Sequence, residues 1–160
     1  MNGAAFIASV IATGRLHGIG IGSPIADVDR AFRSRWIDDV DEPNLSLRRD
    51  YGLVELYFNG PEWVVVGGSV ELHRLATVDG LAEEWQKSEG VEFSEYLAWS
   101  EVETALAHLP DAPALTVDHR QSGYVEYRAQ DLRVSALVVD SHEERDDWPG
   151  HGDVFSVALG

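Results

Sequence analysis

Apolar residues repeat at the spacing of a helix face just after a helix-start signal in this chain. Ile25, Val28 and Phe32 form one stripe behind Ser23-Pro24. Serine is a good N-cap and proline suits the first helical position, so this pair is typical of a helix start. The pattern therefore predicts an amphipathic helix that begins at this pair.

Three further segments are predicted from the same kinds of signal. Residues 4–12 are apolar and stop at Gly14, which indicates a short core helix or strand. Residues 79–90 predict a second helix. Ser100 with Glu103 three residues later forms the pattern of a capping box, which predicts the start of a third.

Elsewhere apolar and polar residues alternate, which predicts β-strands. In residues 53–58 the alternation puts Val54, Leu56 and Phe58 on one face and Leu53, Glu55 and Tyr57 on the other. Between strands, Gly67-Gly68 indicates a bulge or a tight turn, and residues 38–42 predict an acidic loop that ends at Pro43. The predicted strands are 45–49, 53–58, 63–66, 69–75, 115–119, 124–128, 132–139 and 154–159.

This order of elements predicts an α+β fold in which short helices pack on antiparallel β-meander sheets. We expect residues 1–160 to form a single compact domain. A capped helix precedes a hairpin in both halves, and residues 50–57 resemble residues 121–127. The similarity suggests two degenerate helix–β-meander repeats, 18–78 and 97–160. The alternative is that an α+β protein reuses the same order of elements by chance.

The charge of the chain limits its partners. It has 12 basic and 28 acidic residues, a formal net charge of −16. Residues 1–80 carry −4 and residues 81–160 carry −12. Such a charge repels nucleic acid and anionic lipid but attracts basic proteins, although an acidic surface also serves solubility alone. We therefore expect no nucleic acid and no membrane among the partners.

Composition also bears on the compartment. The chain has no cysteine, which excludes disulfides and thiolate chemistry. No apolar run approaches the roughly 20 residues needed to span a bilayer. No basic residue precedes Arg15, unlike in a secretory signal. These features predict a cytoplasmic protein.

Catalytic and cofactor motifs are weak or missing. Residues 18–23 are glycine-rich and precede a helix, but they lack the Walker spacing and its lysine. Residues 140–153 are rich in Asp, Glu and His, yet their spacing matches no known calcium or zinc motif. His73, in a predicted strand, fits a packed residue better than a catalytic base. We therefore expect that the protein is not an enzyme and that it binds neither a metal ion nor a cofactor.

The best functional signal is tryptophan beside acidic residues in predicted loops. Tryptophan is the commonest hot-spot residue of protein interfaces, and nearby acids would attract a basic partner. The alternative is that the two tryptophans of these loops, Trp36 and Trp148, pack beneath the loops. The candidate partner-binding residues are Trp36, Asp38, Asp39, Asp41, Glu42, Glu143, Glu144, Asp146, Asp147 and Trp148.

Two stretches of the sequence resemble small acidic immunity proteins. Such proteins are encoded beside secreted toxins in high-GC bacteria that compete with close relatives. The two stretches are Gly20-Ile21-Gly22-Ser23-Pro24-Ile25-x-x-Val28-x-x-Ala31-Phe32 and Leu47-Arg48-Arg49-Asp50-Tyr51-Gly52-Leu53-Val54-Glu55-Leu56. The resemblance covers residues 18–58, with a looser match in the second half. The order of helix and meander is also similar to the tandem units of β-lactamase-inhibitor-like proteins, which bind enzymes across a sheet.

The resemblance implies a protein that binds one cognate toxin and blocks its active site or substrate channel. The acidic charge suggests that this toxin is basic. Two alternatives stay open: a small-molecule- or metal-binding accessory module, and a structural dimerisation domain. A deep apolar pocket would favour the first. A self-complementary apolar patch would favour the second, and the sequence leaves the oligomeric state open.

Overall fold

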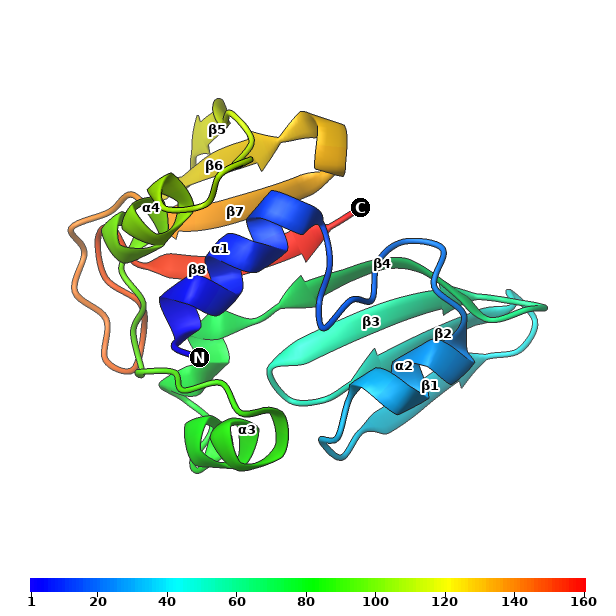
Figure 1. The fold of residues 1–160 in the computed structure, drawn as a ribbon. Coiled ribbons are helices and arrows are strands. Elements are labelled where there is room, and N and C mark those ends of the chain that lie inside the picture. Colours follow the sequence, from blue (N-terminus) through cyan, green and yellow to red (C-terminus); the bar gives the residue numbers. More distant parts are fainter.

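A computed structural model describes residues 1–160 as four α-helices and one eight-stranded antiparallel sheet (Figure 1). The helices are α1 (Gly3–Thr13), α2 (Ile25–Ala31), α3 (Leu81–Glu89) and α4 (Trp99–Ala107). The strands are β1 (Ile37–Asp41), β2 (Ser46–Asp50), β3 (Val54–Asn59), β4 (Val64–Val70), β5 (Thr116–Gln121), β6 (Tyr124–Ala129), β7 (Val134–Val139) and β8 (Val154–Leu159). Two short 3₁₀ helices are η1 (Leu72–Leu75) and η2 (Gln130–Leu132). The predicted α+β fold with β-meanders is confirmed.

The sheet joins two four-stranded meanders. Its strand order is β1-β2-β3-β4-β8-β7-β6-β5, so β1 and β5 are its edges. The meanders meet over three residue pairs, between Gly68–Val70 and Val157–Leu159. The similar segments 50–57 and 121–127 span the β2–β3 and β5–β6 hairpins, which differ in their distance from this junction. The similarity that suggested a repeat therefore does not relate equivalent strands.

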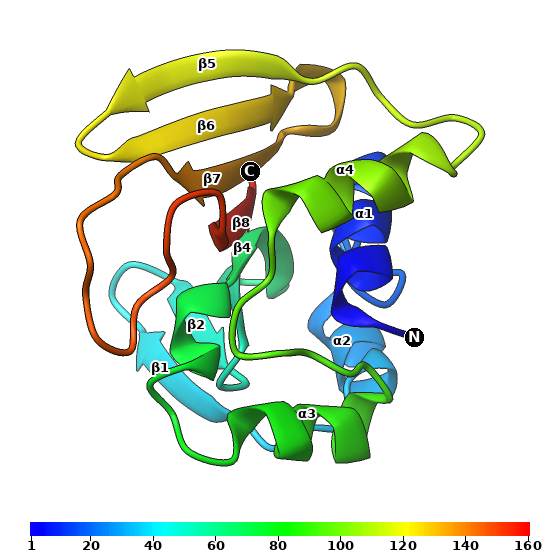
Figure 2. The ribbon, with the colours of Figure 1, turned by 90° about the vertical axis from the view of Figure 1, so that its left-hand side faces the viewer.

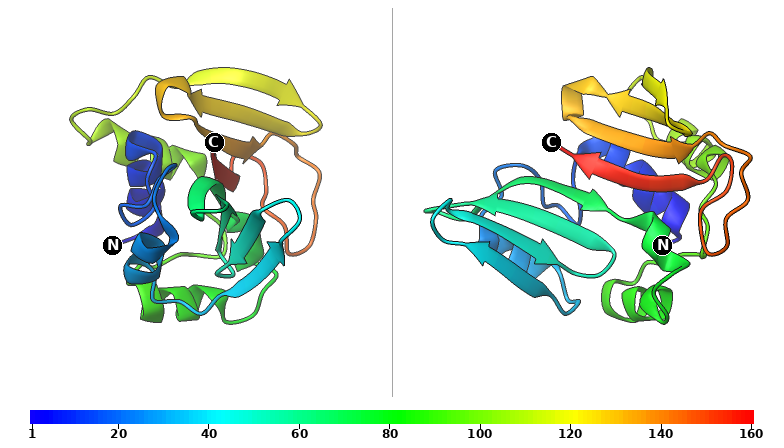
Figure 3. Two further views of the ribbon diagram at one scale, coloured as in Figure 1. Left: turned by 90° about the vertical axis from the view of Figure 1, so that its right-hand side faces the viewer. Right: turned by 180° about the vertical axis from the view of Figure 1, so that it is seen from behind.

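Helices α1, α2 and α4 lie on one side of the twisted sheet, α3 lies beyond the strand ends beside η1, and the other face carries no α-helix (Figures 2 and 3). On β3 Val54, Leu56 and Phe58 are buried in the core beneath the helices, as the alternation predicts. The prediction that Leu53 lies on the face of Glu55 and Tyr57 is wrong, because Leu53 precedes the strand and is also buried in the core. The buried core cluster includes residues from both halves of the chain, from Phe6 to Leu159. Burial of one side of the sheet leaves the opposite face free for polar side chains.

Local capping sets the ends of the helices. The Asn2 side chain accepts a hydrogen bond from Ala5 N–H at 2.8 Å and begins α1. Gly14 and Gly90 end α1 and α3 in the left-handed conformation, as predicted. None of the helices is long and apolar enough to cross a membrane.

The predicted capping box at Ser100 is wrong by two residues. Helix α4 begins at Trp99, and the Glu101 carboxylate, rather than Glu103, accepts from Ala98 N–H at 3.2 Å. Trp99 is buried in the core, so the helix starts early enough to include it. Tertiary packing outweighs the better capping residue here.

Two strand boundaries also differ from prediction. Residues 37–41 form strand β1 rather than an acidic loop, because their backbone pairs with β2 along its full length. Residues 64–70 form one strand with a bulge, where Val66 is the extra residue between the partners of Tyr57 and Phe58. Beyond Val70 the chain turns into η1 instead of continuing as a strand.

The glycine-rich segment 18–23 forms backbone hydrogen bonds with strand β4. Gly22 N–H donates to the Val65 carbonyl at 2.7 Å, and Val65 N–H donates to the Ser23 carbonyl at 2.9 Å. Gly20 N–H donates to the Ser23 hydroxyl at 3.1 Å. These amides are used internally, so they do not form a phosphate cradle.

Candidate functional site

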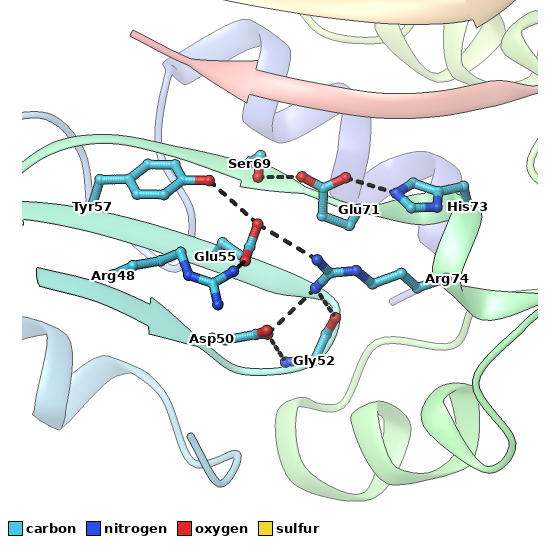
Figure 4. A network of polar contacts seen from close by, with 9 residues as sticks. All are labelled: Arg48, Asp50, Gly52, Glu55, Tyr57, Ser69, Glu71, His73 and Arg74. Carbon is cyan, nitrogen blue, oxygen red and sulfur yellow. Dashed lines mark hydrogen bonds and ion pairs between the residues drawn. The ribbon is translucent and has the colours of Figure 1, made fainter. Parts of the chain in front are cut away.

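The helix-free face of the sheet carries a network of charged side chains (Figure 4). Its centre is Glu55 on β3, whose side chain is only 6% exposed. The Glu55 carboxylate pairs with Arg48 and with Arg74, the latter at 3.6 Å, and Arg74 also donates to the Gly52 carbonyl at 2.9 Å. A buried carboxylate requires partners of this kind, because an isolated charge out of water is strongly unfavourable. The network thereby ties β2, β3 and η1 together.

The hydroxyl of Tyr57 is a further hydrogen-bond donor to the Glu55 carboxylate. It donates to Glu55 Oε2 at 3.3 Å. Burial, and after it the negative charge of Glu55, raises the pKa of Tyr57. The same carboxylate raises the pKa of Arg48. Each partner is therefore held in the protonated form that donates to Glu55.

A second polar chain lies beside this network. The Ser69 hydroxyl donates to Glu71 Oε1 at 2.7 Å, and Glu71 Oε2 lies 2.9 Å from His73 Nε2. The His73 ring stacks on Phe155 with centroids 4.3 Å apart. His73 is packed, as predicted, although it lies in η1 and not in a strand. Stacking and the Glu71 contact fix this ring.

Trp148 belongs to an aromatic cluster on the same side. Its ring lies 5.2 Å from Phe155 and 6.0 Å from His73, and Tyr124 meets Phe155 edge-on. The Arg145 guanidinium lies 5.7 Å from the Trp148 ring. Trp148 is half-buried, so the loop tryptophan is a packing residue with one accessible side.

Trp36 is more accessible, with 45% of its surface exposed, and lies just before β1. The guanidinium of Arg49 lies 4.6 Å from its ring. Arg49 is buried and binds Asp38 through two hydrogen bonds, of 2.8 and 3.1 Å, and Asp29 of α2 at 2.6 Å. Burial opposes the charge of Arg49, but the bonds to Asp38 and Asp29 outweigh it and raise its pKa. Asp38 is therefore engaged internally, and Arg49 holds Trp36 in place.

The remaining acids of this segment are free of ion pairs. All five residues of β1 are exposed, and Asp39, Asp41 and Glu42 make no ion pair, although Asp39 lies opposite Arg48 in the paired strand. Asp41 accepts from the Asn44 side-chain amide at 2.7 Å. These carboxylates therefore face solvent at the sheet edge.

The loop between β7 and β8 holds the other predicted acids. Glu143 pairs with Arg145 at 3.4 Å, while Glu144 has no close cationic partner. Burial first, and then the carboxylates of Glu95, Asp147, Asp153 and Asp146, raise the pKa of Tyr96. Tyr96 is 39% exposed and was not among the candidates from the sequence.

The structure does not bring the two candidate segments together. Residues 36–42 lie at the β1 edge, and residues 143–148 lie at the far end of β7 and β8, well apart in Figures 1 and 3. No group of three or more His, Asp or Glu side chains is arranged to hold a metal ion. The two segments thus form two separate acidic patches, each beside a tryptophan.

Sequence reasoning missed the charged network around Glu55. A signal was present, because Glu55 interrupts an apolar strand. Its partner in the register is Asp50, however, and Arg48 lies opposite Tyr57, so the pairing of Arg48 with Glu55 is diagonal. Arg74 could not be assigned, since it reaches Glu55 from η1, which was predicted as a strand.

No protein-family model, no curated protein and no solved structure matches this chain.

Proposed function

We propose that this protein binds a basic protein and neutralises it, as the immunity proteins it resembles do with their cognate toxins. The observation that carries the proposal is edge strand β1. Ile37 is 78% exposed and Val40 46% exposed, and the same strand carries the carboxylates of Asp39 and Asp41, which make no ion pair. Exposed apolar groups, a free strand edge and uncompensated acids together favour a protein partner of opposite charge.

The charge of the whole surface supports a basic partner. Ten of the 28 acidic side chains pair with an arginine and two more contact only a histidine, which leaves sixteen with neither. Unpaired carboxylates produce a negative field that accelerates the encounter with a cationic protein.

Self-association through the same edge is disfavoured. Two copies of β1 paired in an antiparallel sheet would bring carboxylates of Asp38, Asp39 and Asp41 close to one another. Like charges opposite each other destabilise a strand pair. The edge therefore suits a basic strand or loop better than a second copy of this chain.

The test is capture of the partner followed by neutralisation. The tagged protein is incubated with extract of its native cells at low and at high salt, and the bound proteins are identified by mass spectrometry. We expect one basic protein in near-equal amount, less of it at high salt, and arrest of growth when it is expressed alone. Co-expression with this chain should restore growth. A captured protein whose toxicity is unchanged by co-expression would refute neutralisation.

The two tryptophans distinguish interface from packing. Trp36→Ala is expected to weaken partner binding at least about tenfold with a small change in melting temperature, because the ring is 45% exposed. Trp148→Ala is expected to lower the free energy of unfolding by about 2 kcal/mol, because its ring packs on Phe155 and His73. Calorimetry measures both binding and melting. If Trp36→Ala bound the partner as tightly as the parent protein, the β1 edge would not be part of the interface.

A further inference from the structure

Strand β1 is the more regular of the two edges of the sheet. All five of its residues pair with β2 without a bulge, and it contains no proline. At the other edge, the register between β5 and β6 shifts between Val117 and His119. A bulge of this kind twists an edge strand away from further pairing. Strand β1 is therefore the edge at which another strand can be added.

The hydrogen bonds of the neighbouring hairpin show how the backbone of β2 is oriented. At one end of the β2–β3 ladder, Tyr51 N–H donates to the Val54 carbonyl at 2.8 Å. At the other end, Gly60 N–H donates to the Leu45 carbonyl at 2.7 Å. Bonded and non-bonded pairs alternate along an antiparallel ladder, so the odd-numbered residues of β2 bond to β3.

The same alternation identifies the backbone groups of β1 that point outward. The even-numbered residues of β2 bond to β1, and their partners there are Ile37, Asp39 and Asp41. Asp38 and Val40 alternate with these three, so their N–H and C=O groups point away from the sheet. Among the hydrogen bonds of loops and side chains, none reaches the backbone of these two residues. Each of the two thus offers a donor and an acceptor to an added strand.

Two acidic side chains of β1 determine which charge suits an added strand. Asp39 and Asp41 are two residues apart, so they lie on one face of the sheet. Neither makes an ion pair, and Arg48, which lies opposite Asp39, pairs with Glu55. Opposite charges on directly opposed residues stabilise a strand pair. Lys or Arg at two positions of the added strand, two residues apart, therefore complements this face.

The other three residues of β1 determine the rest of the pattern. Ile37 is 78% exposed and Val40 is 46% exposed, so apolar side chains opposite them would remove apolar surface from water. Asp38 is already bonded to Arg49, so a neutral polar residue suits the position opposite it.

We propose that the basic partner adds one of its own segments to β1 as a further, antiparallel strand of the sheet. Read from its N-terminal end, this segment has the pattern cation–apolar–cation–polar–apolar, opposite residues 41 to 37. Antiparallel addition continues a sheet in which all neighbouring strands are antiparallel. The inference rests on the proposed function and adds to it the chemistry of the segment that the partner contributes.

The test is an NMR titration of the isotope-labelled chain with the peptide acetyl-Thr-Lys-Val-Lys-Thr-Val-Thr-amide at low salt. Saturable shifts and slower hydrogen exchange are expected at the amides of Asp38 and Val40, because the peptide backbone would bond to them. A peptide with Glu in place of both Lys is expected to bind at least about tenfold more weakly, because it repels the acids of β1.

Two methylated peptides distinguish strand addition from charge attraction alone. In the added strand, the residue opposite Val40 donates its N–H to β1, whereas the residue opposite Asp39 points its N–H outward. N-methylation of the first Val of the peptide is therefore expected to weaken binding about tenfold. N-methylation of the Lys that follows it is expected to change binding by less than about twofold. Both peptides leave the protein unaltered, so the comparison does not depend on the folding of a variant.

Val40→Pro tests the same contact on the protein. Proline removes an N–H that bonds to nothing in the protein, and edge strands tolerate proline at such positions. We expect a melting temperature within about 4 °C of the parent and peptide binding at least about tenfold weaker. Val40→Thr keeps the N–H and is expected to bind within about threefold of the parent.

Three results would overturn strand addition: no saturable shifts, equal binding of the two methylated peptides, or undiminished binding by a folded Val40→Pro variant. Capture and neutralisation of a basic protein would still stand in each case, because they are measured without the peptide. Failure of that capture, with the peptide results as expected, would instead contradict the proposed function alone.

Discussion

Glu55 is the residue on which the charged network depends. Its carboxylate lies between Arg48 and Arg74, so Glu55→Gln leaves two guanidinium groups facing each other. We expect this change to lower the free energy of unfolding by about 2 kcal/mol, less than for a fully buried pair because Arg48 is 47% exposed. Urea unfolding measures it. Arg48→Gln keeps the Arg74 contact and should cost clearly less than Glu55→Gln, because Arg48 is exposed to solvent. Equal losses in the two variants would contradict this role of Glu55.

His119 on β5 is a second residue with a specific expectation. Its Nδ1 lies 2.7 Å from the Asp118 carbonyl, and this contact, followed by the Asp118 carboxylate, raises its pKa. Protonation of His119 therefore stabilises the fold at low pH, and this contribution is lost as the pH rises through the raised pKa. NMR titration should show the ring titrating above about 6.5, with a smaller shift in Asp118→Asn because the carbonyl remains. Titration at or below the ordinary value would contradict the contact.

Strand β4 shows how one element depends on the absence of a side chain. A Cβ atom on Gly68 would lie 2.9 Å from the Glu55 carbonyl and 2.8 Å from Leu56 Cδ2. Gly68→Ala is therefore expected to separate β3 from β4 and to cost about 2 kcal/mol in denaturant unfolding. Gly150→Ala is the control, with its nearest neighbour at 3.6 Å and an expected cost below about 0.5 kcal/mol. If the Gly68→Ala variant had the same free energy of unfolding as this control, β3 and β4 would be able to move apart without a measurable cost.

The whole molecule carries a net charge of −16 with sixteen unpaired carboxylates. Self-repulsion destabilises a compact state, so added NaCl should stabilise this fold by screening. We expect about 1 kcal/mol, which corresponds to about 2–4 °C in melting temperature for a chain of this size. Glu144→Gln with Asp146→Asn removes two unpaired charges and should reduce the effect. A melting temperature that falls with salt would mean that ion pairs such as Arg48–Glu55 dominate.

Periodicity alone was enough to predict most elements, because the side-chain patterns of helices and strands differ. The alternation in residues 53–58 was sufficient to place Val54 in the core and Glu55 on the opposite face. Gly14 and Gly90 were sufficient to end two helices, because both adopt positive φ there.

Long-range contacts decided the rest. Residues 37–41 are a strand because β2 pairs with them, although their side chains carry no apolar alternation. Arg74 meets Glu55 only because η1 turns the chain back onto the sheet. The sequence determined which residues are apolar, charged or conformationally free. Tertiary structure alone decided which charges became partners and which stayed exposed, because ion pairing depends on distances between residues far apart in the chain.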